Sequence, residues 1–250
     1  MSDTEINTIA DAIVAAHRDQ TKRVAAAHLA HLSIDAAMAV QGAVIQRLGE
    51  TVPVAKVAIG AEGRGLAAPI ISSTVINDGG KLSSGNGDFL GLEIEIAACL
   101  AQDLTPAIVA QGRDAVLAAL DHFVVGIELI GTRIDDRSKA GPFGPMADNM
   151  ITAGYVRGGQ AIAALPLADG LEMSVTVDGV ERSLGLSKHP FGGVIEPLMA
   201  YAKAPFDQFG GLRAGMVVTT GSLCGLIELA TPARVSVKLG DFDPVSFTLI

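Results

Sequence analysis

Residues 91–97 alternate strictly between apolar and charged side chains. At the two-residue period of a β-strand, leucine and isoleucine occupy one face, and Glu93 and Glu95 lie side by side on the other. The apolar run continues through residues 97–100, so we expect the two carboxylates to be poorly solvated. Neighbouring carboxylates in such a setting repel each other, so either one takes a proton or a cation lies between them. The alternative is an ordinary solvated strand with two exposed glutamates.

A second apolar run, residues 123–130, carries one carboxylate, Glu128, near its middle. Three glutamates inside apolar strands predict one shared site. Carboxylate oxygens are the ligands that hard divalent cations prefer, so the site would hold such an ion.

Lys56 is the one charged residue in the strand-like stretch 52–59. Burial among apolar neighbours lowers the pKa of a lysine towards the range that is useful for proton transfer. The alternative is a lysine on an edge strand whose ammonium group reaches water.

The remaining pattern predicts a helical segment over residues 1–50, followed by a β-rich domain over 51–250. Helical spacing covers residues 3–17, where Ser2 and Glu5 have the spacing of a capping box, and 34–48, with Ser33 as N-cap and Gly49 as the stop. Further predicted strands are 70–76, 171–177, 180–184, 216–220, 235–239 and 245–250, and further predicted helices are 112–120 and 191–203. Asp178-Gly179 predicts a hairpin between two of these strands.

Composition excludes several classes of function. The chain of 250 residues is 49% hydrophobic, enough for a sizeable core, and its net charge of −9 disfavours binding to nucleic acid. No uninterrupted apolar run reaches the length of a membrane span, and the acidic N-terminus is not a signal peptide, so we expect a cytoplasmic protein without a membrane partner. Cys99 and Cys224 lie in apolar stretches and are expected to be buried thiols.

Five motifs, in order along the chain, resemble the 2-keto-4-pentenoate hydratase branch of the fumarylacetoacetate hydrolase superfamily. The resemblance extends from about Val54 to the C-terminus. The motifs are Glu93-Ile94-Glu95-Ile96-Ala97 with Asp103-Leu104, the stretch from Ile127 to Ile134, Ala147-Asp148-Asn149, His189-Pro190, and Ala214-Gly215 with Val218 to Leu223.

The resemblance implies an α+β fold in which mixed β-sheets roll into a barrel-like core with flanking helices. It implies Mg²⁺ or Mn²⁺ on Glu93, Glu95 and Glu128, and Lys56 as the proton-transfer lysine. It also implies a homo-oligomer.

The chemistry of such a site extends the expected set of residues. A 2-oxo acid can chelate a metal that three carboxylates leave partly open, and the metal then stabilises an enolate as a Lewis acid. Thr220, Ser222 and the adjacent Leu223 are expected to bind the substrate. Asp148 would order the attacking water or, as the alternative, cap a short helix.

The predicted function is a divalent-metal-dependent lyase that adds water to a 2-hydroxy-2,4-dienoate and gives a 4-hydroxy-2-oxo acid. Two polar positions of the family hydratases are apolar here, at Ile70 and Ile151, and this keeps decarboxylation of a vinylogous 2-oxo diacid such as 4-oxalocrotonate as an alternative. A non-catalytic homologue that binds metal or ligand is a further alternative. Carbon–carbon hydrolysis usually needs a water activated by a histidine. It is disfavoured, because we expect His122 to precede the strand of Glu128 and His189 to belong to the late helix.

Overall fold

The computed structural model describes residues 1–83 and 87–250 and has an α+β fold, as the sequence predicted. The α-helices are α1 (Asp3–Arg18), α2 (Ile34–Leu48), α3 (Pro106–Val109), α4 (Arg113–Ala118), α5 (Gly144–Ala147) and α6 (Ile195–Lys203). Short 3₁₀ turns are η1 (Ala26–His28), η2 (Ala61–Gly63), η3 (Ser72–Thr74), η4 (Arg137–Lys139) and η5 (Asn149–Ile151). The strands are β1 (Val54–Ile59), β2 (Gly65–Ile70), β3 (Val75–Asn77), β4 (Lys81–Leu82), β5 (Asp88–Leu100), β6 (Leu120–Thr132), β7 (Thr152–Arg157), β8 (Glu172–Val177), β9 (Val180–Leu186), β10 (Val217–Thr219), β11 (Ala233–Leu239) and β12 (Val245–Leu249).

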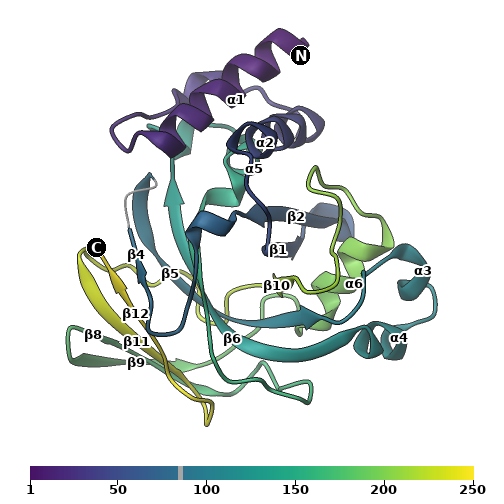
Figure 1. Ribbon diagram of the computed structural model, residues 1–250, viewed down its shortest axis with the longest axis vertical. Helices are drawn as coiled ribbons and strands as arrows, with labels where there is room; N and C mark the ends of the chain where they lie inside the picture. The colour runs from purple at the N-terminus through teal and green to yellow at the C-terminus, as the bar shows by residue number, and fades with distance from the viewer. Residues whose placement is uncertain (84–86) are drawn as a thin grey trace.

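Within the described ranges these strands form two sheets. The larger has the order β2-β1-β10-β5-β6-β7-β3, and the smaller has the order β4-β12-β11-β8-β9. In Figure 1 the long strands β5 and β6 bend around the middle of the molecule, and β8, β9, β11 and β12 lie on the outer side of that bend. Helices α3, α4 and α6 cover another side of the larger sheet.

Side chains along β5 point alternately to the two faces of the curved larger sheet, and the two faces have different surroundings. Leu92, Ile94 and Ile96 belong to the main core, which also contains buried residues of β8, β11 and β12. They therefore face the smaller sheet. The opposite face of the larger sheet holds a second cluster, with Ala97 and Tyr155 among its members, and it also carries the two glutamates of β5.

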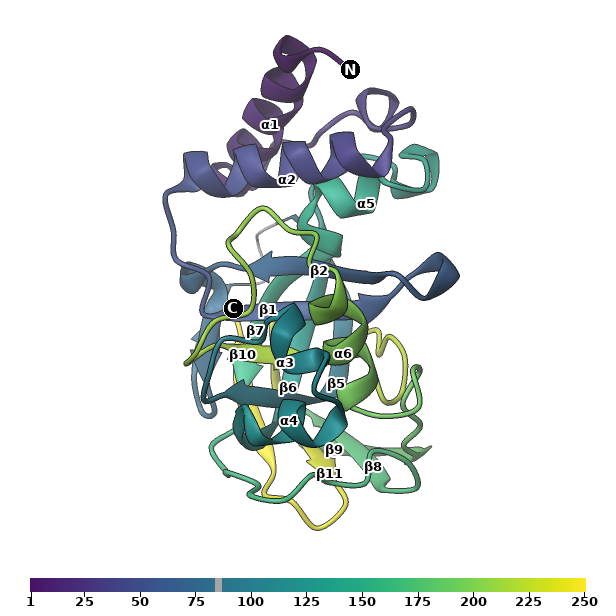
Figure 2. The same ribbon diagram turned by 90° about the vertical axis from the view of Figure 1, so that its right-hand side faces the viewer.

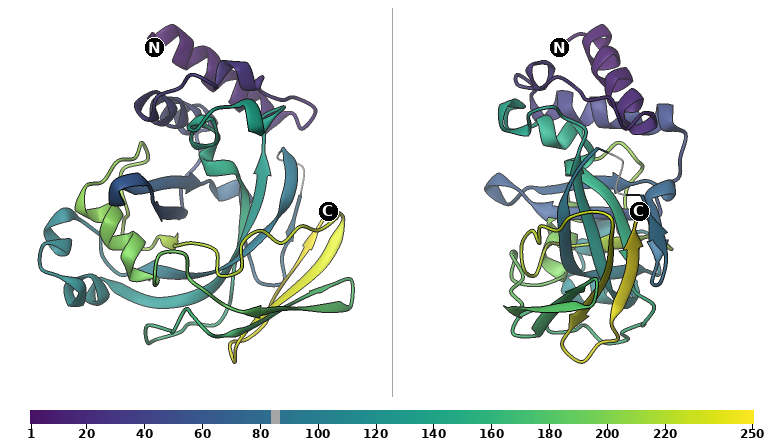
Figure 3. Two further views of the ribbon diagram at one scale, coloured as in Figure 1. Left: turned by 180° about the vertical axis from the view of Figure 1, so that it is seen from behind. Right: turned by 90° about the vertical axis from the view of Figure 1, so that its left-hand side faces the viewer.

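Curling of the larger sheet brings distant strands together on its inner face. In the order β1-β10-β5-β6, Lys56 on β1 is three strands away from Glu128 on β6. In a flat sheet that separation would be about 14 Å at the usual strand spacing. The Lys56 Nζ and Glu128 Oε1 atoms are nevertheless 2.6 Å apart. The inner face is thus strongly concave, and the view from behind in Figure 3 shows the same bend.

The N-terminal helices form a layer beyond the sheets (Figure 2). The predicted capping box of Ser2 and Glu5 is present, Ser33 caps α2, and Gly49 ends it in the left-handed conformation at φ 69°. The apolar faces of α1 and α2 share one buried cluster with Ile134, Ala140, Met146 and Ala147. The segment before residue 50 therefore packs against the stretch that follows β6. The division of the chain at residue 50 stays a prediction.

Several predicted elements differ from the structure. Residues 70–76 are not one strand, because β2 ends at Ile70 and the turn η3 precedes β3. Strands β2 and β7 were not predicted. Strand β6 begins at Leu120, so His122 lies within the strand of Glu128 and not before it, as we had expected. The helix predicted over 191–203 begins only at Ile195, and Cys224 is half-buried, whereas Cys99 is buried. The hairpin over Asp178-Gly179 is confirmed. No helix in the described ranges is both long and apolar enough to span a membrane.

A buried ion pair ties the end of β6 to the segment that leads into β7. Arg133 is 1% exposed and Asp148 is 0% exposed. The Arg133 Nε donates to Asp148 Oδ1, and the Arg133 backbone N donates to Asp148 Oδ2 over 2.9 Å. The Arg133 guanidinium also donates to the carbonyl of Thr152 over 2.8 Å. The side chain of Asp148 makes no capping bond to η5, so the capping alternative is wrong.

We predict that replacing Asp148 with alanine will destabilise the fold by about 3–5 kcal/mol, because Arg133 would keep a buried charge without its carboxylate. Urea unfolding, carried out both without Mg²⁺ and with excess Mg²⁺, would measure the loss of stability. The control is Lys139→Ala, which breaks an exposed pair with Asp136, keeps the bonds from Ser138 to Asp136 and should leave the unfolding midpoint unchanged. Equal midpoints for the Asp148 variant and the wild type would contradict the structural role of the pair.

Candidate metal centre

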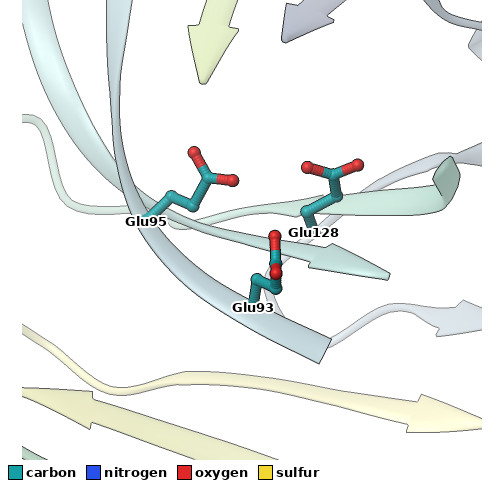
Figure 4. Close-up of side chains that lie close together, drawn as sticks. All are labelled: Glu93, Glu95 and Glu128. Atoms are coloured by element: carbon teal, nitrogen blue, oxygen red, sulfur yellow. The ribbon is translucent and has the colours of Figure 1, made fainter. Parts of the chain in front are cut away.

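Three carboxylates converge on the concave face of the larger sheet. Glu93 and Glu128 are direct partners in the antiparallel pairing of β5 with β6, and Glu95 is two residues further along β5. One oxygen from each lies within 4.8 Å of the other two. Figure 4 shows the three side chains turned towards one another. Glu95 and Glu128 are 2% and 0% exposed, and Glu93 is half-buried, so the solvated-strand alternative is wrong.

Lys56 reaches the same cluster from the other side of the curled sheet. Its Nζ atom is 2.6 Å from Glu128 Oε1 and donates to the carbonyl of Met150 over 3.2 Å. The side chain is only 13% exposed, so the alternative of an ammonium group that reaches water does not hold.

The backbone that offers this carbonyl is strained. Asn149, Met150 and Ile151 are consecutive residues with φ values of 50°, 51° and 57°. Each non-glycine residue in this left-handed region costs about 1–2 kcal/mol, and a β-branched residue is rare there. Asp148, held by Arg133, precedes this turn directly. The ion pair and the turn together place the Met150 carbonyl beside Lys56.

The turn after β10 holds Glu95. The Thr219 hydroxyl donates to Glu95 Oε2, and the backbone N of Gly221 donates to the same oxygen over 2.6 Å. These two bonds leave the other oxygen of Glu95 free to turn towards Glu93 and Glu128. Thr219 was not among the predicted site residues. It pairs in register with Lys56 on the neighbouring strand β1, and the sequence alone does not give this pairing.

The predicted substrate-binding residues lie around this turn, and their side chains already form contacts within the protein. The Thr220 hydroxyl donates to the carbonyl of Ile96 over 3.0 Å and is 3.2 Å from His189 Nε2. The Ser222 hydroxyl donates to the carbonyl of Gly225 over 3.1 Å. Leu223 is buried in the main core. Their roles towards a substrate stay predictions, as does the role of Asp148 in ordering a water.

Burial and crowding of like charges shift the ionisation of the cluster. Burial, followed by the nearby charge of Glu128, raises the pKa of Glu95 to about 8, although the Thr219 hydroxyl and the Gly221 amide oppose the rise. Burial and then Glu128 also raise the pKa of Glu93. For Lys56, burial lowers the pKa, but the charges of Glu128, Glu95 and Glu93 outweigh it, so that its pKa is raised overall. The depressed lysine pKa that we expected from burial alone is therefore not found with the three carboxylates beside it.

These residues suit a hard divalent cation. When all are ionised, three carboxylates and one ammonium leave two negative charges, which one divalent cation neutralises. Octahedral Mg²⁺ at about 2.1 Å needs ligand oxygens about 3–4 Å apart, so only small side-chain movements are required. Within the described part of the chain, Glu128 Oε2 is buried and accepts no hydrogen bond, and a bound cation would satisfy it.

Comparisons with known proteins give structural matches alone. No family model and no curated protein matches the chain. Among solved structures, 4-oxalocrotonate decarboxylase from Pseudomonas putida G7, complexed with magnesium and adipate, is similar with a TM-score of 0.80 and 17% identity, covering 100% of this chain and 99% of that one. The same enzyme with calcium and acetate gives a TM-score of 0.78.

Two further structures match a smaller share of the chain. The 2-hydroxyhepta-2,4-diene-1,7-dioate isomerase from Mycobacterium marinum has a TM-score of 0.56 and 13% identity over 80% of this chain and 75% of that one. A protein assigned to the fumarylacetoacetate hydrolase family, from Yersinia pestis CO92, has a TM-score of 0.56 and 18% identity over 80% of this chain and 94% of that one. The chain therefore shares its fold with 4-oxalocrotonate decarboxylase over its whole length and, over four fifths of its length, with a protein of the fumarylacetoacetate hydrolase family.

Proposed function

We propose that this protein is a divalent-metal-dependent enzyme that decarboxylates a vinylogous 2-oxo diacid. The observation that carries the proposal is the convergence of Glu93, Glu95 and Glu128 on one buried site, with Lys56 against Glu128. Carboxylate ligands in this number leave coordination positions open for a bidentate ligand such as a 2-oxo acid.

Mg²⁺, held by Glu93, Glu95 and Glu128, would supply Lewis-acid polarisation of the 2-oxo group. In a vinylogous 2-oxo diacid, cleavage of the bond to the distal carboxylate releases CO₂, and the electron pair moves through the conjugated chain to the 2-oxo oxygen. Lys56 carries the proton that this oxygen, or the terminal carbon, then receives. Glu128 and the Met150 carbonyl fix the position of that proton.

Decarboxylation is favoured over hydration by two observations. The structure of 4-oxalocrotonate decarboxylase matches the whole chain, and the adipate in that complex is itself a diacid. Ile70 is fully buried in the apolar cluster of the concave face, and Ile151 lies in the strained turn. Both are apolar where a hydratase of this kind would place groups able to order water, and loss of CO₂ requires no added water.

Hydration of a 2-hydroxy-2,4-dienoate is the second candidate, because the Glu93–Ala97 and Ala147–Asn149 motifs resemble the hydratase branch. Both reactions place negative charge on the 2-oxo oxygen, so the metal site serves either one. We also propose Mg²⁺ or Mn²⁺ as the cofactor, a cytoplasmic location and a homo-oligomeric assembly.

The direct test is to assay the metal-loaded protein with 2-oxohex-3-enedioate for CO₂ release and with 2-hydroxypenta-2,4-dienoate for hydration. We expect CO₂ release that EDTA abolishes and Mg²⁺ restores. Glu93→Gln should lower kcat/KM by about a hundredfold or more, since loss of even an outer partner of a metal ligand typically costs 10–100-fold. The matched control is Glu172→Gln, at an exposed position on β8 in the other sheet, which should be as active as the wild type.

The two candidate reactions and the non-catalytic alternative give different results. Turnover of the dienoate without CO₂ release from the diacid would favour the hydratase. Tight Mg²⁺ binding without turnover of either substrate would contradict an enzyme of this class.

For Lys56 we predict that Lys56→Met will lower kcat by about 10²–10⁴-fold, the usual contribution of a positioned proton donor. The variant should still bind Mg²⁺, because removing a positive charge beside the carboxylates favours a cation. Lys56→Arg preserves the charge and serves as the control for electrostatics. Assays with saturating Mg²⁺ would measure kcat for each variant. Near-wild-type turnover by Lys56→Met would show that Lys56 is not the proton carrier.

The raised pKa of Glu95 predicts a pH dependence of the metal-free protein. Its pKa is about 8 in the fold, against 4.5 for a solvated glutamate, so between these pH values the folded state binds more protons than the unfolded state. Stability should therefore fall as the pH rises from about 4.5 to 8. Metal must displace the same proton, so Mg²⁺ affinity should rise over this range.

Urea unfolding in EDTA at several pH values, together with calorimetric titration of Mg²⁺, would measure both effects. In Glu95→Gln the fall in stability should largely disappear. An equally steep fall in this variant would assign the effect to other groups.

A further inference from the structure

Tyr155 is a buried residue of the concave face that the proposed mechanism does not use. It lies on β7, is 0% exposed, and its hydroxyl has no hydrogen-bond partner among the described residues. A buried hydroxyl without a partner is destabilising, and phenylalanine would fill the same space without that penalty. The tyrosine therefore calls for a partner that only a ligand-bound state, or a small movement of its neighbours, supplies.

The pairing of the strands shows where this hydroxyl points. Tyr155 on β7 is opposite Glu128 on β6. Its ring crosses β6 at Gly126, because a Cβ atom built on Gly126 would lie 1.7 Å from the Tyr155 Oη atom. Gly126 in turn pairs with Glu95 on β5. The Tyr155 side chain thus passes over the glycine towards the buried metal-ligand candidate Glu95.

The groups at the end of this path can accept a hydrogen bond. Thr219 uses its hydroxyl hydrogen to bond Glu95 Oε2, which leaves the lone pairs of its oxygen available. Burial raises the pKa of Tyr155 well above its usual range, and the Thr219 side chain, which lies beside the phenol, opposes that rise. The phenol can donate its hydrogen to the Thr219 oxygen. A chain of bonds from phenol to threonine to carboxylate would be strengthened by mutual polarisation.

We propose that Tyr155 is a positioning residue for Glu95, donating through Thr219 to hold this carboxylate in the orientation that binds a divalent cation, and that Gly126 is glycine to admit it. The inference rests on the proposed metal site and adds a residue to it. Partners that orient metal ligands commonly contribute 10–100-fold to metal affinity.

The test uses Tyr155→Phe, which removes only the hydroxyl. Mn²⁺ binding to the metal-stripped protein would be followed by electron paramagnetic resonance, and Mg²⁺ binding by calorimetry. We expect a 10–100-fold weaker affinity for both ions, with a Tm in EDTA that is unchanged or raised. Tyr201→Phe is the matched control, because Tyr201 is equally buried but its hydroxyl donates to Asp207. The Tyr201→Phe variant should bind both ions with wild-type affinity.

Variants of Thr219 test the same contact from its other end. Thr219→Ser retains the hydroxyl and should bind Mn²⁺ as the wild type does, whereas Thr219→Val should bind it weakly. In the Thr219→Val background, adding Tyr155→Phe should cause little further loss, because the route from phenol to carboxylate is already cut. Fully additive losses would overturn the proposed route.

Wild-type affinity in Tyr155→Phe would overturn the inference and leave the metal site standing. Absence of Mn²⁺ binding by the wild type would overturn both the inference and the proposed function.

Discussion

The structure depends on a concentration of negative charge that the fold cannot neutralise with its own side chains. Glu93, Glu95 and Glu128 share one largely buried site, and Lys56 supplies a single positive charge. Burial, and then the repulsion from Glu128, raises the pKa of Glu93 and of Glu95. A divalent cation relieves this repulsion. The side chains of the metal-free protein are therefore already arranged to favour binding of such an ion.

The curled sheet creates this concentration, and the rest of the fold maintains it. Antiparallel pairing sets Glu93 opposite Glu128, and the curl brings Lys56 across three strands. The turn after β10 fixes one oxygen of Glu95, while the Arg133–Asp148 pair and the left-handed turn hold the carbonyl that receives Lys56. The left-handed turn is strained and the three carboxylates repel one another, and such unfavourable features are common where a site is built for a ligand.

The sequence predicted the parts of the site that depend on local alternation. Glu93, Glu95, Glu128 and Lys56 could be placed on strands because a two-residue period assigns each to one face. The fold class followed from the same pattern and from the motifs. One shared site was predicted because all three carboxylates lie in apolar strands. Periodicity alone does not give the register between distant strands that brings them together.

Other features were missed for physical reasons. β2 contains Pro69 and little polar alternation, and β7 follows a strained turn that no propensity predicts, so neither was expected. Asp148 was assigned to the helix cap or to a water, whereas its carboxylate binds Arg133, because nothing in the local sequence indicates a buried partner 15 residues away. Thr219 lies on the strand beside β5 and Tyr155 on the strand beside β6, and their proximity to the carboxylates appears only once the register is known.

The most direct measurement is anomalous diffraction from crystals of the protein soaked with Mn²⁺. The account predicts one strong peak within about 2.0–2.3 Å of an oxygen from each of Glu93, Glu95 and Glu128, the range of metal–carboxylate bonds for ions of this size. Well-ordered carboxylates at this site without such a peak, or a Mn²⁺ ion bound only by other residues, would contradict it.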